Sequence, residues 1–244
     1  MKNREIVLSE RLQMLAEMVT PGYRVADIGC DHGFLSIYLV QKGISPHVLA
    51  MDVRKGPLAA ATEHVENSGL GAYIETRLSD GMCGMRDDEA ETVVCAGMGG
   101  RLMEKILTES MDKAKALKEL ILQPQSELRE FRAFLRRMGF RITDESAVYE
   151  EGKFYFAMKA VYTGEEIGVE AKADINEQNI LDEFGELLLC RRNPVLKQYL
   201  MFRRNVLSQL LEKLLGENTG RASARLAEVR QELTEIETAL CRYA

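Results

Sequence analysis

The chain has 244 residues, of which 46% are hydrophobic and 29% charged, a composition typical of a globular protein with a buried core. Its formal net charge of -6 argues against a uniformly cationic nucleic-acid binder but allows a local basic face. The N-terminal residues lack the apolar region of a secretory signal, and no apolar run reaches the length of a membrane span, so we expect a cytoplasmic protein.

In chain order, the first predicted element is a helix over Ser9–Val19, which Thr20-Pro21-Gly22 ends. Short apolar runs and helical patterns then alternate. The predicted buried strands are Arg24–Ile28, Val48–Asp52, Tyr73–Arg77, Thr92–Ala96 and Glu119–Gln123. The predicted helices between them are Phe34–Lys42, Gly56–Ser68, Arg101–Glu109 and Glu127–Met138. This alternation predicts an α/β fold with a mostly parallel sheet and helices on both of its faces.

The series of strands ends in a different pattern. The runs Phe140–Tyr149 and Lys153–Tyr162 are joined by Glu150-Glu151-Gly152, which predicts an antiparallel hairpin. A seven-stranded, Rossmann-like sheet that ends in such a hairpin is typical of class I methyltransferases, whereas ordinary dinucleotide-binding folds lack the hairpin. We therefore predict a class I methyltransferase domain over residues 1–163.

Residues 164–244 are predicted to form a second, α-helical domain. Gly164 to Glu177 is polar and acidic and is interpreted as a linker. Two leucine-rich seams follow, and Gly216–Gly220 separates them. The first seam runs through Leu196, Leu200, Arg203, Leu207, Leu210 and Leu214, and the second runs through Leu226, Val229, Leu233, Ile236 and Leu240. The pattern predicts a coiled-coil-like antiparallel helical hairpin, with a dimerising coiled coil as the alternative, so the protein is expected to be a monomer or a homodimer.

The loop Asp27-Ile28-Gly29-Cys30-Asp31-His32-Gly33 follows the first predicted strand. Its glycines allow a tight turn and the close approach of a ligand. The carboxylates of Asp27 and Asp31 oppose a pyrophosphate but suit a ligand that carries an ammonium and a sulfonium group. The loop therefore favours S-adenosylmethionine over a dinucleotide such as NAD.

Carboxylates also follow the next two predicted strands. Asp52 is placed to accept the hydroxyl groups of an adenosine ribose, and Asp80 is placed to accept an adenine amino group. Taken singly, Asp80 is also a common turn former before Gly81. Acidic residues at three successive strand ends favour a shared ligand site, because ligands bind at that edge of such sheets.

The fourth predicted strand leads into Ala96-Gly97-Met98-Gly99-Gly100, where the glycines indicate a close approach of backbone and ligand. The loop lacks the Asn-Pro-Pro-Tyr or Asp-Pro-Pro-Tyr motif of many amine methyltransferases, which argues against chemistry at the exocyclic amine of adenine. Gln123 and Gln125 follow the fifth strand and either contact a base or cap the next helix. The predicted cofactor-binding residues are Asp27, Gly29, Cys30, Asp31, His32, Gly33, Asp52, Val53, Asp80, Gly81, Ala96, Gly97 and Met98.

The five cysteines are scattered and form no C-x-x-C pair, and the three histidines do not cluster with them. The sequence therefore predicts neither a metal site nor a disulfide framework.

Four segments together resemble the bacterial TrmK family of tRNA (adenine-22 N1)-methyltransferases. They are Leu8-Ser9-Glu10-Arg11-Leu12, Asp27-Ile28-Gly29-Cys30-Asp31-His32-Gly33, Ala96-Gly97-Met98-Gly99-Gly100 and Leu122-Gln123-Pro124-Gln125. The resemblance covers the whole chain. It implies a class I fold, S-adenosylmethionine as methyl donor, tRNA as substrate and a cytoplasmic setting.

Two locally basic segments are the candidate RNA-binding face. Its predicted residues are Arg132, Arg136, Arg137, Arg191, Arg192, Lys197, Arg203 and Arg204. Such clusters hold phosphates, and the neighbouring Tyr199 and Phe202 are able to stack on unpaired bases. The alternative is an ordinary solvated helix face. Charge alone leaves this choice open, and the resemblance favours RNA.

Adenine N1 has an available lone pair, so methylation there needs mainly in-line placement against the sulfonium. We expect the target adenine to be unstacked to reach the pocket. Asp31 is the candidate catalytic residue, either stabilising the positive charge of the product ring or accepting an amino proton. The alternatives are a methyltransferase for another RNA site, a small molecule or a protein, and a non-catalytic cofactor-binding scaffold.

Overall fold

The computed structural model describes residues 6–164, 175–216 and 220–243, in two compact units, Met1–Ala171 and Lys172–Ala244. Each unit has its own buried apolar residues. Most of the predicted linker lies outside the described residues. None of the described helices is long and apolar enough to cross a membrane.

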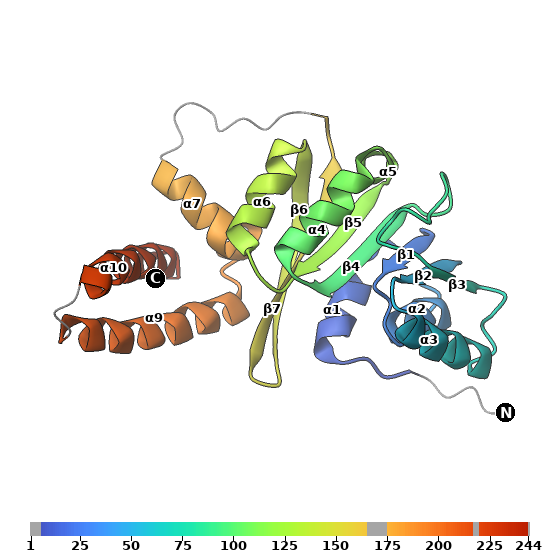
Figure 1. Ribbon diagram of the computed structural model, residues 1–244, viewed down its shortest axis with the longest axis horizontal. Coiled ribbons are helices and arrows are strands. Elements are labelled where there is room, and N and C mark those ends of the chain that lie inside the picture. Colours follow the sequence, from blue (N-terminus) through green and yellow to red (C-terminus); the bar gives the residue numbers. More distant parts are fainter. Residues whose placement is uncertain (1–5, 165–174, 217–219, 244) are drawn as a thin grey trace. The chain divides into compact units, whose positions relative to one another are not determined.

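The first unit is built on a seven-stranded sheet in the order β3-β2-β1-β4-β5-β7-β6 (Figure 1). The strands are β1 Val25–Ile28, β2 Val48–Asp52, β3 Ile74–Leu78, β4 Thr92–Met98, β5 Glu119–Pro124, β6 Phe140–Glu150 and β7 Lys153–Tyr162. Strands β1 to β5 pair in parallel, while β7 is antiparallel to both β5 and β6. The predicted fold class is therefore confirmed.

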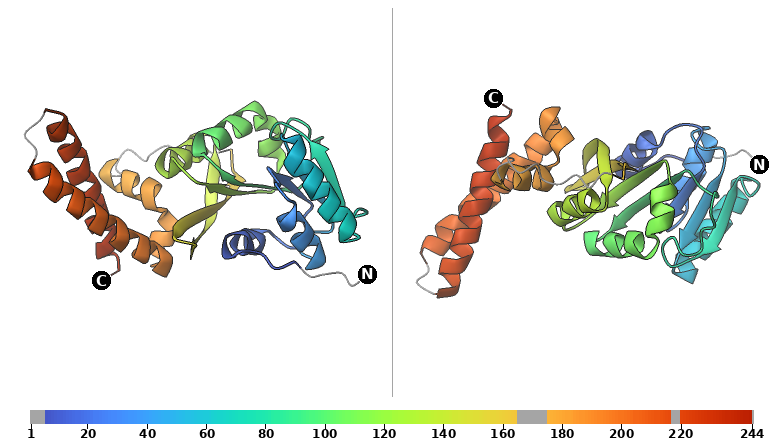
Figure 2. Two further views of the ribbon diagram at one scale, coloured as in Figure 1. Left: turned by 60° about the horizontal axis from the view of Figure 1, so that its bottom comes forward. Right: turned by 90° about the horizontal axis from the view of Figure 1, so that it is seen from above.

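Helices cover both faces of the sheet, because successive strand residues point to opposite sides. Val25 of β1 packs with α1 Glu10–Met18, α2 Phe34–Gln41 and α3 Lys55–Asn67. The next residue, Ala26, packs with α4 Gly100–Glu109, α5 Met111–Ala116 and α6 Leu128–Arg137. Figure 2 shows these two helical layers on either side of the strands. Helix α5 was not predicted, since its six residues are too few to show a helical period.

The β6–β7 hairpin turns at Glu151 and Gly152, which have φ angles of 49° and 80°. Two successive positive φ angles are the signature of a tight hairpin turn whose twist matches that of the strands. The hairpin also holds α1. The Glu150 carboxylate accepts hydrogen bonds from the backbone N–H groups of Glu10, at 2.6 Å, and Arg11, at 3.4 Å. The first helix of the chain is thereby fixed to the last hairpin of the unit.

The second unit contains α7 Ile175–Phe184, α8 Glu186–Cys190, α9 Pro194–Leu215 and α10 Gly220–Cys241. Arg203 Nη2 donates to Glu232 Oε2 at 2.8 Å, and the Tyr243 hydroxyl donates to the Asn193 carbonyl at 3.1 Å. The first contact joins the middle parts of α9 and α10, and the second joins the start of α9 to the residues just after α10, so the two helices form the expected antiparallel hairpin (Figure 2).

The leucine seams of this hairpin lie inside it. Leu196, Leu200, Leu207 and Leu214 are buried on α9, and Val229 and Ile236 are buried on α10. The predicted linker is corrected at its end, because α7 already begins at Ile175. Helices α7 and α8 were not predicted, since their acidic and short segments show little helical periodicity.

Candidate functional site

A cavity of about 630 Å³ lies at the carboxyl ends of β1 to β4. All the predicted cofactor-binding residues except Gly33 line it. The further lining residues that were not predicted to be part of a site include Arg11, Leu12, Phe34, Arg54, Leu102 and Ile106. They come from α1, the start of α2, the segment after β2, and α4, so only the folded chain brings them together.

Asp27, the last residue but one of β1, carries a buried carboxylate, with 5% of its surface exposed. The Ser36 hydroxyl donates to its Oδ2 at 2.7 Å. Burial raises the pKa of Asp27 to about 6, against the lowering effect of the Ser36 hydrogen bond and with a small addition from the charge of Asp52. A cationic ligand group beside Asp27 would favour the charged form of this carboxyl group.

Asp52 and Asp31 are linked through Arg54. Asp52 accepts from the backbone N–H of Arg54 at 2.8 Å and from that of Asp31 at 3.3 Å. The Arg54 guanidinium lies 3.4 Å from Asp52 and 3.5 Å from Asp31. Asp31 itself has a φ of 50°, and its side chain is 60% exposed at the cavity mouth. The arrangement fixes Asp52 in the cavity wall and leaves Asp31 accessible to a substrate.

Gly29 makes room in the cavity floor. Its φ is 74°, and a Cβ atom there would lie 2.3 Å from Met98 Cε, so a side chain would collide across the cavity. Gly33 is a correction, because it does not line the cavity. Its N–H donates to the Cys30 carbonyl at 2.8 Å, and a Cβ would lie 3.1 Å from that of Ala61. Gly33 thus allows α2 to begin close to α3 and offers no donor to a ligand.

Aromatic side chains gather beside the loop that follows β1. The rings of Phe34 and His64 stack with centroids 4.9 Å apart, and the His32 ring lies 6.0 Å from each. His32 and Phe34 both line the cavity. These two rings give the polar cavity a flat apolar wall.

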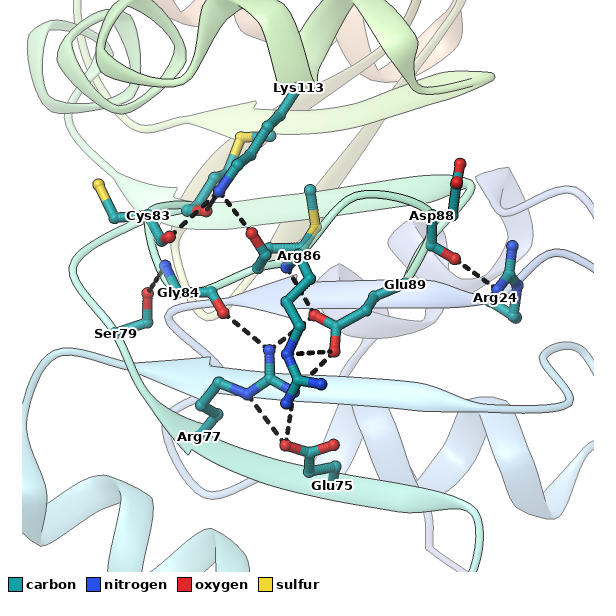
Figure 3. Close-up of polar contacts among 12 residues, drawn as sticks. Arg24, Glu75, Arg77, Ser79, Cys83, Gly84, Arg86, Asp88, Glu89 and Lys113 are labelled. Carbon is teal, nitrogen blue, oxygen red and sulfur yellow. Dashed lines mark hydrogen bonds and ion pairs between the residues drawn. The ribbon is translucent and has the colours of Figure 1, made fainter.

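Asp80 and Gly81 belong to a loop that other side chains clamp in place (Figure 3). The Ser79 hydroxyl donates to the Gly81 carbonyl at 3.0 Å and accepts from the Gly84 N–H at 2.9 Å. Arg77 donates to the Gly84 carbonyl at 2.7 Å and forms an ion pair with Glu89 at 2.7 Å. This ion pair lowers the pKa of Glu89 to about 2.

Lys113 of α5 holds the same loop from the opposite side. Its ammonium group donates to the carbonyls of Met82, at 3.2 Å, of Cys83, at 3.1 Å, and of Met85 (Figure 3). Asp80 therefore both forms a turn and faces the cavity from a fixed backbone.

The cavity end formed by β4 and β5 carries nitrogen donors. Strand β4 has an irregular register between Ala96 and Met98, so Gly97 bulges with a φ of 77°. A Cβ on Gly97 would lie 3.5 Å from Arg11 Nη1 and 3.8 Å from Gln125 Nε2. Gln125 lines the cavity, whereas Gln123 is fully buried behind it. No side-chain hydrogen bond caps α6, so the capping alternative for the two glutamines is wrong.

Among the predicted RNA-binding residues, Arg132 is a second correction. Its side chain is 4% exposed, and its Nε donates to Glu145 at 2.9 Å. The guanidinium is therefore buried in an ion pair inside the protein and is not exposed to RNA. Arg203 and Arg204 pair with Glu232 and Glu237 on α10. The other members are exposed or partly exposed: Arg136, Arg137, Arg191, Arg192 and Lys197.

The five cysteines are free thiols, and burial raises the pKa of both Cys30 and Cys95. Within the described part of the chain, no group of three or more histidine, cysteine or acidic side chains is arranged to hold a metal ion.

The residues of the cavity fit S-adenosylmethionine. Gly29 has no side chain, and the methyl end of Met98 lies close to it in the cavity floor. Carboxylates at the ends of three successive strands suit the ligand's ammonium, ribose hydroxyl and adenine amino groups. The three carboxylates disfavour a pyrophosphate, in agreement with the sequence prediction.

The strand order, the closing hairpin and this carboxylate-lined cavity together define a Rossmann-like methyltransferase. In agreement, the family model described as a methyltransferase domain matches residues 8–158, so the chain belongs to that family.

The similar proteins include a Bacillus subtilis protein named tRNA (adenine(22)-N(1))-methyltransferase. It is 36% identical over 156 residues, which make up 64% of this chain and 66% of the relative. The crystal structure of B. subtilis TrmK is 27% identical with a TM-score of 0.82, over 96% of this chain and 99% of that one. A putative tRNA (m1A22) methyltransferase from Streptococcus pneumoniae, in complex with S-adenosyl-L-methionine, is 29% identical with a TM-score of 0.81, over 96% and 100%. The resemblance to the TrmK family is confirmed.

Proposed function

We propose that this protein methylates N1 of the adenine at position 22 of tRNA, with S-adenosylmethionine as the methyl donor. The observation that carries the proposal is the single cavity that gathers Asp27, Asp52 and Asp80 around the glycine floor. The substrate is inferred from the relatives described above, one of which is named tRNA (adenine(22)-N(1))-methyltransferase. A tRNA substrate places the protein in the cytoplasm.

The bound cofactor supplies an electrophilic methyl group on a sulfonium. The residues of the protein bind the cofactor and orient it toward the target base. Asp27 holds the ammonium group, Asp52 accepts from the ribose hydroxyls, and Asp80 accepts from the adenine amino group. Gly97 lies beside Arg11 and Gln125, at the end of the cavity where the target base is proposed to enter. Because adenine N1 is already a free nucleophile, placement of the base is the main task of the protein.

The experiment that tests this function uses two tRNA transcripts, one with adenine and one with guanine at position 22. We expect labelled methyl groups to appear only in the first transcript, with a reverse-transcription stop at that position, because an N1-methyl group blocks base pairing. Label that appears in both transcripts, or only in protein and metabolite pools, would contradict the proposal.

For Asp31, the proposed role is to stabilise the positive charge that develops on the adenine ring. Asp31→Ala is expected to lower turnover at saturating cofactor by about 10- to 100-fold, as loss of a positioned electrostatic group does. Binding of S-adenosylhomocysteine, measured by calorimetry, is expected to change much less. The opposite result, weak cofactor binding with normal turnover at saturation, would make Asp31 a binding residue only.

On the helical unit, Arg192 and Lys197 are the proposed phosphate contacts, because both side chains are exposed. We expect the Arg192→Ala/Lys197→Ala double variant to bind tRNA more weakly. The slope of the logarithm of the binding constant against the logarithm of the salt concentration is expected to become less steep, by an amount that corresponds to up to two lost phosphate contacts. Lys213→Ala, at the far end of the same helix, is the control. Equal losses in the two variants would indicate a general effect of net charge.

A further inference from the structure

Gln125 is a polar residue of the cavity to which the proposed cofactor contacts give no role. It follows β5 and lines the cavity with an exposed side chain. Among the described residues, its side-chain amide has no hydrogen-bond partner. Gln123 differs, because it is fully buried and its Oε1 accepts from Arg11 at 3.1 Å. An amide carries both an acceptor and donors, so Gln125 offers both kinds of group to a ligand.

The position of Gln125 in the sheet separates it from the nucleoside end of the cofactor. Asp80 follows β3 and Asp52 ends β2, and β1 and β4 lie between these strands and β5. Neighbouring strands are about 4.8 Å apart, so roughly 14 Å separate β2 from β5. A Cβ on Gly97 would lie 3.8 Å from Gln125 Nε2. Gln125 therefore stands at the end of the cavity where the target base is proposed to enter.

The backbone of Gln125 is fixed to the loop that follows β4. Its N–H donates to the Met98 carbonyl at 2.8 Å, and the Gly100 N–H donates to the Ser126 hydroxyl at 3.4 Å. A Cβ on Gly100 would lie 2.6 Å from the Ser126 carbonyl oxygen, so only glycine allows the two loops to come this close. The side chain of Gln125 is thus presented from a rigid base, and little order has to be gained when a ligand binds.

From this placement, we propose that Gln125 is the specificity-determining residue for the target adenine. The inference rests on the proposed function and deepens it. During methyl transfer, N1 of the base faces the sulfonium, which leaves N7 and one hydrogen of the amino group free on the neighbouring edge. Gln125 Oε1 accepts from this amino group, and Nε2 donates to N7. Such a bidentate pair is the usual way in which an amide side chain recognises adenine.

The same contact rejects guanine. On this edge guanine presents two acceptors, O6 and N7, whereas an amide in one orientation offers one donor and one acceptor. Gln125 Oε1 would then face O6 without a hydrogen between them. Selection for adenine therefore does not depend on the edge of the base that reacts.

The test compares two tRNAs that differ only in whether position 22 carries adenine or 7-deazaadenine, in which a C–H group replaces N7. For the wild-type protein, we expect kcat/KM for methylation to be at least about fivefold lower with 7-deazaadenine. For Gln125→Leu, kcat/KM with adenine is expected to fall by a similar factor, and the two tRNAs are expected to agree within about twofold. The intrinsic reactivity of each ring is the same in both proteins, so this comparison isolates the contact with N7.

A charged variant makes the prediction sharper. Gln125→Glu keeps an acceptor for the amino group but places a carboxylate oxygen against N7. We expect this variant to methylate the 7-deazaadenine tRNA at least as fast as the adenine tRNA, which reverses the wild-type preference. Gln13→Leu is the matched control, because the Gln13 amide donates to Glu17 at 2.8 Å and does not line the cavity. It is expected to keep the wild-type preference.

Three results would overturn the inference: a wild-type protein that methylates both tRNAs equally well, a Gln125→Leu variant that keeps the wild-type preference, or one whose affinity for S-adenosylhomocysteine falls by more than about twofold in calorimetry. The first of these leaves the proposed function standing. If the wild-type protein methylates position 22 in neither tRNA, the proposed function fails and this inference fails with it.

Discussion

Asp27→Asn is expected to make the protein more stable at pH 8 and at the same time to weaken its binding of S-adenosylhomocysteine. Asp27 is buried, and burial raises its pKa from the ordinary value of an aspartate to about 6. Above pH 6 the folded protein therefore carries an ionised carboxylate that burial disfavours. Asparagine keeps an oxygen for the Ser36 hydroxyl and removes that charge, which stabilises the fold by about 1–3 kcal/mol.

The stability gained by Asp27→Asn is expected to depend on pH. Because the folded pKa is the higher one, the gain from asparagine is complete above about pH 6 and disappears below about pH 4, where the wild-type carboxyl is protonated in both states. Urea denaturation of both proteins at pH 8 and pH 4 measures it. A variant that is no more stable at pH 8, or that binds S-adenosylhomocysteine as tightly as the wild type, would contradict the role given to Asp27.

Arg132→Ala is expected to have the largest effect on stability, a loss of about 3–5 kcal/mol in the free energy of unfolding. Arg132 on α6 and Glu145 on β6 are both buried, and their ion pair is 2.9 Å long. Removing the arginine takes away the guanidinium that pairs with the buried Glu145 carboxylate. Thermal unfolding at neutral pH reports the loss directly.

Two further variants separate this charge effect from a general effect of mutating α6. Arg137→Ala removes an exposed arginine from the same helix and is expected to change stability by less than about 0.5 kcal/mol. The double replacement Arg132→Met/Glu145→Leu removes both charges and is expected to recover most of the stability. If the double variant is as unstable as Arg132→Ala, packing rather than charge explains the loss.

Sequence patterns predicted the strands of the sheet well, but they did not distinguish the buried Arg132 from the exposed arginines of the same helix. Alternating apolar runs predicted each strand of the sheet, because burial on both faces leaves a local signal in the sequence. The basic pattern of α6 carried no sign that one arginine faces inward. The partner of Arg132 lies 13 residues away on β6 and becomes visible only when the helix packs.

The same limit applies to the cavity. The loops after β1, β2, β3 and β4 were predicted as one site, because parallel strands bring their carboxyl ends to one edge. Arg11 was missed as a cavity residue, because a charged residue on the polar side of an amphipathic helix gives no sign of a binding site. Only the resemblance to a family drew attention to its segment. Arg54 was missed because its contacts depend on the side-chain positions of Asp52 and Asp31.

The hydrogen bonds between the Glu150 carboxylate and the first turn of α1 have a consequence for the order of folding. The two ends of that contact are 140 residues apart in sequence. Closing so long a loop is entropically costly and slow, so α1 docks late, after the central strands have paired. A nascent chain still lacking β6 and β7 is thus expected to lack the contact that fixes the first turn of α1, so the cavity wall formed by this helix is completed only when the hairpin has folded.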